Sequence, residues 1–323
     1  MKKIINNIDI RVVNIQIDIQ IYKMPNLSCY LMGGLGNQLF QIFATIAHGI
    51  KYQNKVIFPY SEVLIVGTLR VTYWDTFLKN IQFMLTKNNL IKNQDLEKFQ
   101  LYRENGYHYT PIMNSPNTDV MLYGYFQSYK YFEKEFASIV SLIGLRKWQK
   151  QIRDEFPILF SKDTHYISMH FRLGDYVNLQ DHHPLMPYEY YEKALRYIIE
   201  KQQLLNNNNN ETNSQKKYRI LYFCQECDNM VVSSIIKRLA NSLPIPNENF
   251  IKMDDLVSDW KQMLLMSNCN DNIIANSTFS WWGGYFNENT DKIVCYPAVW
   301  FGPKLTQNNT ADLFPENWRK IDF

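Results

Sequence analysis

The chain has 323 residues, of which 46% are hydrophobic and 20% charged, and this is the composition of a globular protein. The length predicts two domains, each large enough to bury its own core, and excludes a small scaffold held together by disulfides. The net charge of +3 is too small for the dense positive surface that non-specific nucleic-acid binding requires. Aromatic residues are unusually frequent at 15%, and they line carbohydrate and nucleotide clefts as well as cores.

The first 24 residues form a β-prone extension. Apolar and polar residues alternate through residues 8–21 with one phase break at Val13, which predicts a bulged strand or a hairpin. Such a strand could cover a sheet edge or pair with a second copy of the chain. Charged residues, among them Asp9 and Arg11, interrupt the apolar stretch, so we expect no signal peptide and no transmembrane segment there. A soluble protein of the reducing cytoplasm is expected.

Short apolar runs alternate with helical patterns through the remainder of the chain. Strands are expected at residues 27–32, 56–58, 120–125, 166–171, 219–224, 272–276 and, as the last strand, 292–296. Helices are expected after the glycine turn at 33–36, at residues 128–140, 188–203, 230–240 and 255–268, and after residue 284. This alternation predicts an α/β protein with two doubly wound parallel sheets that face each other across a cleft.

The predicted domains are an N-terminal one over residues 25–150 and a C-terminal one over residues 151–323. Charged, helix-like sequence with Pro157 makes residues 141–164 the expected passage between them. The asparagine-rich run at residues 206–217 has no apolar side chains to pack, so it is predicted to be a disordered surface loop.

Five cysteines are present, and only Cys224 and Cys227 are close in sequence. Their Cys-x-x-Cys spacing allows a redox or zinc site, but neither a second pair nor suitably spaced histidines accompany it. The alternative is a pair of buried thiols at a strand end.

A glycine-rich segment follows the strand expected at residues 27–32. It reads Gly33-Gly34-Leu35-Gly36-Asn37-Gln38 and leads into a helical pattern. Glycines at such a turn let the backbone approach a ligand closely, and the helix N-terminus behind them favours negative charge. The dinucleotide and P-loop fingerprints are not met, because Leu39 replaces the last glycine and no Gly-Lys-Ser/Thr follows. The segment predicts either a phosphate-binding turn or a tight turn with an Asn/Gln cap.

The strand expected at residues 166–171 ends in His170-Phe171-Arg172-Leu173-Gly174-Asp175-Tyr176. His170 and Arg172 point to the same face of such a strand, because side chains alternate along it. An arginine at the carboxyl end of a parallel strand is well placed to bind a phosphate through its planar fork of donors. Asp175 could orient that guanidinium or accept a proton, or the two could form a structural ion pair at a domain edge.

A third segment, Asn276-Ser277-Thr278-Phe279-Ser280-Trp281-Trp282-Gly283-Gly284, follows the strand expected at residues 272–276. Hydroxyl and backbone N–H groups at a helix start form a second anion-binding cradle, and burial in the core is the more frequent outcome for the tryptophans. The sequence has no Asp-x-Asp triplet, and its nearest approach, Asp254-Asp255, opens an expected helix. A diphosphate bound without a metal must then rely on arginine and helix N-termini.

Together the three segments resemble, in order, the patterns G-G-L-G-N-Q-x-F-Q, H-x-R-x-G-D-Y and N-S-T-F-S-W-W-G of the α-1,2-fucosyltransferases of glycosyltransferase family 11. The resemblance covers roughly residues 27–323. It implies a GT-B-like fold of two Rossmann-like domains. It further implies an inverting transfer of L-fucose from GDP-β-L-fucose to a sugar hydroxyl, usually the 2-hydroxyl of a galactose, with no cofactor and no divalent metal.

The resemblance also implies roles for matching residues. Arg172 matches the arginine that meets the donor diphosphate, and Ser277, Thr278 and Ser280 form the hydroxyl cradle. The catalytic candidates are His170, Arg172 and Asp175; the base is open between His170 and Asp175, with Glu189 and His182-His183 as alternatives. The other expected donor-binding residues are Gly34, Gly36, Asn37, Gln38, Glu226, Asp228, Asn276 and Phe279.

The sequence departs from the family at the end of the strand expected at residues 219–224. The family usually has Phe-Ser-Asp-Asp there, in a segment expected to touch the nucleotide. This chain continues from Phe223 as Cys224-Gln225-Glu226-Cys227-Asp228, where Glu226 or Asp228 could still accept hydrogen bonds from guanine or ribose. A related enzyme that uses another deoxysugar nucleotide therefore stays open. A carbohydrate-binding protein without turnover is a separate alternative.

Overall fold

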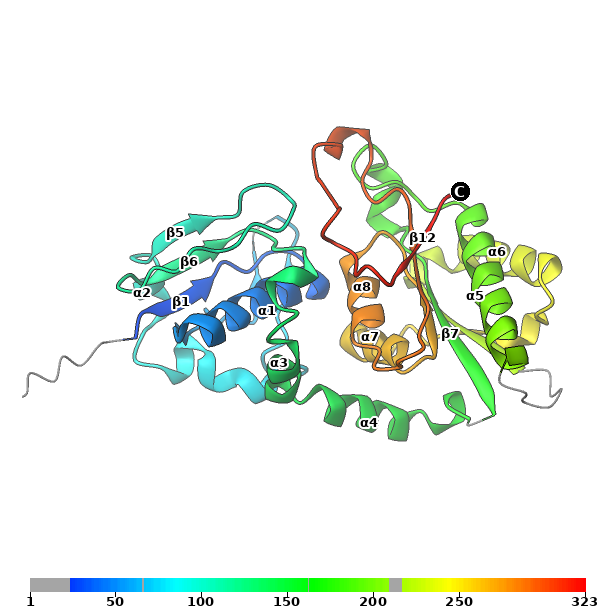
Figure 1. The fold of residues 1–323 in the computed structure, drawn as a ribbon, viewed down its shortest axis with the longest axis horizontal. Coiled ribbons are helices and arrows are strands. Elements are labelled where there is room, and N and C mark those ends of the chain that lie inside the picture. Colours follow the sequence, from blue (N-terminus) through cyan, green and yellow to red (C-terminus); the bar gives the residue numbers. More distant parts are fainter. Residues whose placement is uncertain (1–23, 66, 162, 209–216) are drawn as a thin grey trace, which may run out of the picture.

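The computed structural model describes residues 24–65, 67–161, 163–208 and 217–323. Within them the chain forms two separate parallel sheets with helices between and around them (Figure 1). The strand predicted at residues 8–21, and self-association through it, lie outside the described residues. No helix in the described part of the chain combines the length and the apolar character that a membrane span needs.

The first sheet has four parallel strands in the order β2-β1-β6-β5, flanked by a small antiparallel hairpin of β3 and β4. From β1 the chain adds β2 on one side and later returns to place β6 on the other side. A ligand-binding crevice is expected where the winding direction reverses in this way. The strands are β1 (Asn26–Cys29), β2 (Lys55–Val56), β3 (Val63–Leu64), β4 (Arg70–Val71), β5 (Gln100–Arg103) and β6 (Val120–Tyr123).

The second sheet has six parallel strands in the order β12-β11-β10-β7-β8-β9. Its winding direction reverses between β7 and β10, so the carboxyl ends of these two neighbours form the corresponding crevice. The strands are β7 (Thr164–His170), β8 (Lys217–Phe223), β9 (Phe250–Lys252), β10 (Asp271–Ile273), β11 (Val294–Pro297) and β12 (Arg319–Ile321).

Helices cover both faces of the second sheet, with α5 and α6 on the outer face and α7 and α8 on the face toward the first sheet (Figure 1). Helix α4 runs between the two halves. The predicted domain boundary at residue 150 lies within this helix and stays a prediction. The helices are α1 (Leu35–Tyr52), α2 (Asn93–Leu96), α3 (Phe136–Ile143), α4 (Leu145–Glu155), α5 (Tyr188–Asn208), α6 (Asn229–Ser242), α7 (Asp259–Ser267) and α8 (Thr278–Tyr285).

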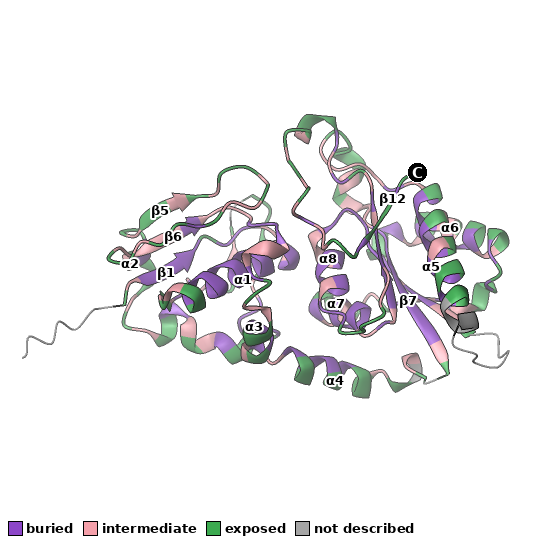
Figure 2. Ribbon diagram, in the orientation of Figure 1, coloured by how far each residue is buried: buried purple, intermediate pink, exposed green. Residues whose placement is uncertain are grey.

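The two halves share one hydrophobic core, which lies where α1 packs against α8. The ring of Phe40 lies 4.5 Å from that of Trp281, and the ring of Phe43 lies 4.6 Å from that of Trp282. Both tryptophans are fully buried, as expected for core residues. Figure 2 shows the buried residues continuing from α1 into α8, so the contact between the halves is part of the core.

Several predicted elements are wrong in their bounds. The helix predicted at residues 128–140 is a 3-10 turn at Tyr129–Tyr131 followed by α3, because Phe132 has a non-helical backbone (φ −138°, ψ 0°). Helix α8 comprises the third segment itself, because Ser277 caps it, and does not begin after residue 284.

The last strand is β12, not the one predicted at residues 292–296. The predicted loop at 206–217 is wrong at both ends, since α5 continues to Asn208 and β8 begins at Lys217; residues 209–216 lie outside the described residues.

Candidate functional site

A cleft of about 1120 Å³ lies between the two halves, at the carboxyl ends of the central strands of both sheets. The glycine turn after β1, the turn after β7 and the segment after β10 all line this cleft. The three segments, each predicted to follow a strand, therefore meet in one cleft. They meet because each one follows a strand beside the point where its sheet reverses direction.

Two helices begin side by side in the cleft wall. Helix α1 begins after Gly34 and α8 begins after Ser277, and Gly36 of α1 touches the first residues of α8. A Cβ atom on Gly36 would lie 2.4 Å from the carbonyl carbon of Thr278 and 2.7 Å from the backbone nitrogen of Phe279. Only glycine permits this approach, which brings together the N-termini of two helices and the positive ends of their dipoles. Such a place favours an anion.

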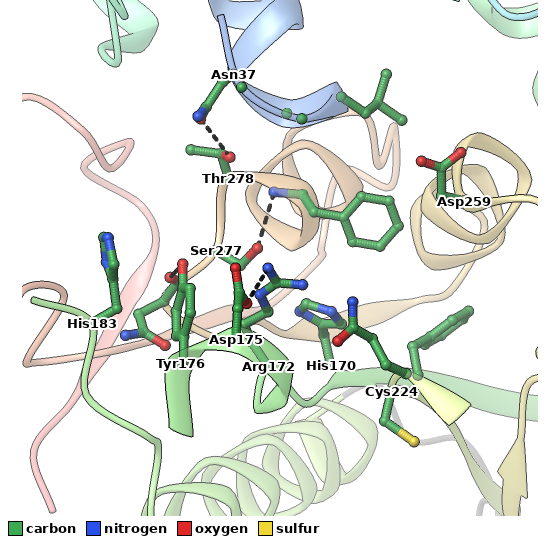
Figure 3. A pocket seen from close by; sticks show the side chains of 18 of the residues that line it. Asn37, His170, Arg172, Asp175, Tyr176, His183, Cys224, Asp259, Ser277 and Thr278 are labelled. Carbon is green, nitrogen blue, oxygen red and sulfur yellow. Dashed lines mark hydrogen bonds and ion pairs between the residues drawn. The ribbon is translucent and has the colours of Figure 1, made fainter. Parts of the chain in front are cut away.

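The side chain of Asn37 links these helix starts to the first sheet. Its Oδ1 atom accepts hydrogen bonds from Nε2 of Gln127 and from Oγ1 of Thr278, each at 2.9 Å. Figure 3 shows Asn37 above Thr278 at the top of the cleft. The Oγ atom of Ser277 accepts a hydrogen bond from the backbone nitrogen of Phe279 and caps α8. Asn37 is therefore a bridge between the two halves within the cleft wall.

Arg172 lies below the helix starts, beside Asp175 and Tyr176 (Figure 3). Its Nη2 atom donates to Oδ1 of Asp175 at 2.6 Å, and its guanidinium lies 5.0 Å from the centre of the Tyr176 ring. The Nε atom is buried and has no hydrogen-bond partner among the described residues. Because burying an unpaired donor is costly, this guanidinium is suited to a ligand that accepts further hydrogen bonds.

His170 lines the cleft next to Arg172, and its ring is largely buried. Burial, and then the positive charge of Arg172, lower the pKa of His170 to about 3, so the imidazole is neutral at physiological pH. Its Nδ1 atom has no partner among the described residues. A histidine with so low a pKa is a weak proton acceptor, but its ring can still hydrogen-bond to a bound ligand.

Comparison with known proteins shows which family this chain is similar to. The model of glycosyl transferase family 11 matches residues 225–322. An α-1,2-colitosyltransferase of Escherichia coli is 26% identical over 314 residues, which cover 90% of this chain and 97% of that relative. A galactoside 2-α-L-fucosyltransferase of Caenorhabditis elegans is 25% identical and covers 97% of this chain and 84% of its own length. The chain is therefore similar to glycosyltransferase family 11.

Two further comparisons are partial. The O-antigen biosynthesis glycosyltransferase WbnK of Escherichia coli is 28% identical over 204 residues, and the match spans 61% of this chain and 59% of WbnK. Among solved structures, FUT1 of Arabidopsis thaliana in complex with GDP aligns with a TM-score of 0.43 and 10% identity, over 91% of this chain and 75% of that chain. The two facing parallel sheets of this glycosyltransferase form the GT-B arrangement that the sequence predicts.

Some residues predicted to bind the donor do not line the cleft. Gln38 is buried beneath the glycine turn, and Ser280 is buried with its hydroxyl against the carbonyls of Ala275 and Ser277. Both side chains lie on the inner face of a helix, and the sequence pattern did not show which face of the helix each one occupies.

Asp228 is also buried. Its two carboxylate oxygens each accept from the backbone nitrogen of Gly174 at 3.1 Å. It therefore holds the turn after β7, where Gly174 has φ +37°. Glu226 does line the cleft.

The alternative bases fall in different places. Glu189 forms an exposed ion pair with Arg238, and neither Glu189 nor His182 is part of the cleft wall. His183 lines the cleft and stacks on Tyr176, with the two ring centres 4.7 Å apart. Burial, and then the neighbouring His182, lower the pKa of His183.

Other cleft residues have no signal in the sequence. Tyr107, Tyr125 and Phe301 form an aromatic end, where Tyr107 packs edge-on against Phe301 at 5.0 Å between ring centres. The hydroxyl of Tyr107 donates to Gln127, the residue that also holds Asn37. Arg70 lines the cleft from the hairpin of β3 and β4. These residues come from loops and short strands without a recurring pattern, so only the folded chain brings them together.

The Cys-x-x-Cys pair consists of two free thiols. Cys224 is buried and its pKa is raised to about 11 by that burial, whereas Cys227 is exposed, so buried thiols were correctly predicted only for Cys224. Among the described residues, no group of three His, Cys, Asp or Glu side chains is placed to hold a metal ion.

Proposed function

We propose that the protein transfers L-fucose from GDP-β-L-fucose to a sugar hydroxyl, the 2-hydroxyl of a galactoside, during glycan synthesis. The observation that carries this proposal is the meeting of two helix N-termini with Arg172 in one cleft between the two sheets. This combination suits the diphosphate of a nucleotide sugar. The names of two relatives, a galactoside 2-α-L-fucosyltransferase and an α-1,2-colitosyltransferase, support the choice of sugar and linkage.

In the proposed reaction the acceptor oxygen attacks the anomeric carbon from the face opposite the diphosphate. The bond from that carbon to the diphosphate oxygen breaks, and its electron pair leaves with GDP. Arg172 and the starts of α1 and α8 stabilise the charge that develops on the leaving group, so the proposal requires no divalent metal. The acceptor proton passes to a base in the cleft.

We assign the two ends of the cleft to the two substrates. Phe223 ends β8 and Glu226 follows it at one end, where they suit the base and ribose of the nucleotide. The aromatic end of Tyr107, Tyr125 and Phe301 suits the apolar face of a sugar ring on the acceptor side. This division makes the first sheet the acceptor side and the second sheet the donor side.

Asp175 is our candidate for the base. Its carboxylate is exposed in the cleft, while burial keeps His170 a weak acceptor. We expect Asp175→Asn to lower kcat by about 10²–10⁴-fold. Because the amide oxygen can still accept from Arg172, GDP affinity should change by less than about threefold. Parallel kinetics and GDP titration check this, and an equal loss in both quantities would instead make Asp175 an orienting partner of Arg172.

A second candidate function differs only in the donor sugar. The colitosyltransferase relative aligns over 97% of its length, and this chain carries Cys224-Gln225-Glu226-Cys227-Asp228 after β8. Colitose is L-fucose without its 3-hydroxyl group, so the same cleft could hold either sugar.

A thermal-shift panel with EDTA present tests the proposal. It comprises GDP-β-L-fucose, GDP-L-colitose, GDP-mannose and UDP-galactose. A donor at about 100 times its Kd stabilises the fold by about 2.7 kcal/mol. We expect the largest shift with GDP-β-L-fucose. A largest shift with GDP-L-colitose supports the second candidate, and shifts only with UDP-galactose, or only after metal is restored, contradict both.

A further inference from the structure

Arg70 is a charged residue of the cleft that belongs to none of the three segments. It lies on β4, partly buried, and lines the same cleft as Arg172 from the first half of the chain. Within the described residues Arg70 has no ion-pair partner, whereas Arg172 is paired with Asp175. The cleft wall also carries Glu226, Asp255 and Asp259. Arg172 alone, with its charge already offset by Asp175, supplies little positive charge to balance the diphosphate that the cleft is proposed to hold.

The backbone around Arg70 is fixed from both halves. The Nε2 atom of Gln38 donates to the carbonyl of Val71 at 2.9 Å and to that of Gly33 at 3.0 Å. Gln38 is 1% exposed, so it is a buried tie between the glycine turn and β4. On the other side, the hydroxyl of Tyr73 donates to the carboxylate of Asp259 in α7. Arg70 is therefore held between the glycine turn and the second half.

The charge of Arg70 acts on the same group as the charge of Arg172. Burial raises the pKa of Tyr176, and the positive charges of Arg172 and Arg70 both oppose that rise. Arg70 likewise opposes the larger effect of burial on the pKa of Tyr73. Charges from both halves of the chain therefore act on the hydroxyl of Tyr176.

We propose that Arg70 is a second donor-binding residue, whose guanidinium contacts the donor diphosphate opposite Arg172, and that Gln38 is the positioning residue that holds Arg70 there. The inference rests on the proposed function, because the diphosphate comes from the proposed donor. It gives Gln38 a role at a distance from the ligand, through the carbonyl of Val71.

The test compares GDP and guanosine binding by titration calorimetry at one fixed ionic strength, with UDP, ADP and CDP as further probes. Arg70→Gln should weaken GDP binding by about 10–100-fold and leave guanosine binding unchanged, because only GDP carries the diphosphate. Arg70→Lys should retain part of the affinity, since it keeps the charge and loses the planar fork. The control is Arg103→Gln on β5, an exposed arginine that stacks on Tyr123 and does not line the cleft.

The outcomes separate this inference from the proposed function. Unchanged GDP binding in Arg70→Gln, with a wild-type protein that prefers GDP to guanosine, overturns the inference alone. A wild-type protein that binds no nucleoside diphosphate overturns the proposed function and this inference with it.

Gln38 is tested by a double-mutant cycle. Gln38→Leu should weaken GDP binding in the wild-type background and add little in the Arg70→Gln background, because its effect passes through Arg70. Gln38→Met serves as the second variant if Gln38→Leu does not fold, and circular dichroism checks both. If the losses of GDP affinity multiply in the double variant, Gln38 acts independently of Arg70, and its proposed role as the residue that positions Arg70 is overturned.

Discussion

Replacing Arg172 with glutamine should lower kcat/KM for sugar transfer by about 10²–10³-fold, the cost typical of removing one preorganised donor from a developing negative charge. Its guanidinium has a buried Nε atom without a partner in the described structure and lies beside the starts of two helices. The loss should also appear as weaker GDP binding, because the leaving group and GDP carry the same diphosphate. Steady-state kinetics and calorimetry measure the two effects.

The stability of the Arg172→Gln variant should change by about 0.5 kcal/mol or less. The pair with Asp175 is solvent-exposed on the aspartate side, and such ion pairs contribute little to folding. Arg238→Gln is the matched control, since Arg238 also pairs with a carboxylate but lies outside the cleft. Wild-type turnover by Arg172→Gln would show that the diphosphate is held elsewhere.

Replacing Gly36 with alanine should destabilise the protein by about 3 kcal/mol, the upper end for overpacking a core. The new Cβ would meet backbone atoms of Thr278 and Phe279, which cannot rotate away, and Trp282 donates to the carbonyl of Gly36 from inside the shared core. For a chain of this length, Tm should fall by roughly 4–5 °C.

Gly34→Ala is the control for this stability measurement. A Cβ atom there would have no heavy atom within 4 Å, and the backbone is extended at φ −77°, ψ −176°. Differential scanning calorimetry of both variants compares the same chemical change two residues apart. Equal melting temperatures for Gly36→Ala and the wild type would mean that α1 and α8 can separate without cost, contrary to the packing described above.

The joint between the halves is thus also part of the site. Asn37 reaches Thr278 across the joint, and Gly36 allows the contact. A change that moves α1 from α8 should therefore disturb ligand binding as well as stability.

The sequence predicts the fold well where the residue types of a segment are typical of one kind of local structure. Buried parallel strands are apolar runs, so β7 and β8 are recognisable, and glycine or hydroxyl residues after a strand mark the turn into a helix. The resemblance to family 11 and the GT-B fold are confirmed. The domain boundary, the site residues and the absence of a metal requirement stay predictions.

Other features depend on contacts that no local pattern encodes. The strand β12 reads Arg319-Lys320-Ile321 and is polar because it lies at a sheet edge. The aromatic run at 128–140 looks helical, but its rings pack into the shared core through a break at Phe132. Arg70 lies on a two-residue strand, and only the bond from Gln38 shows why its position is defined.

The central claim is that this cleft transfers L-fucose with inversion to the 2-hydroxyl of a galactoside. Its most direct test is to incubate the wild-type protein with GDP-β-L-fucose and a β-galactoside in EDTA and to determine the product by mass spectrometry and NMR. We predict one added fucose, α-linked to O2 of galactose, with one GDP released per transfer. A β-linked product, or no consumption of GDP-β-L-fucose under conditions where the folded protein binds GDP, would contradict the claim.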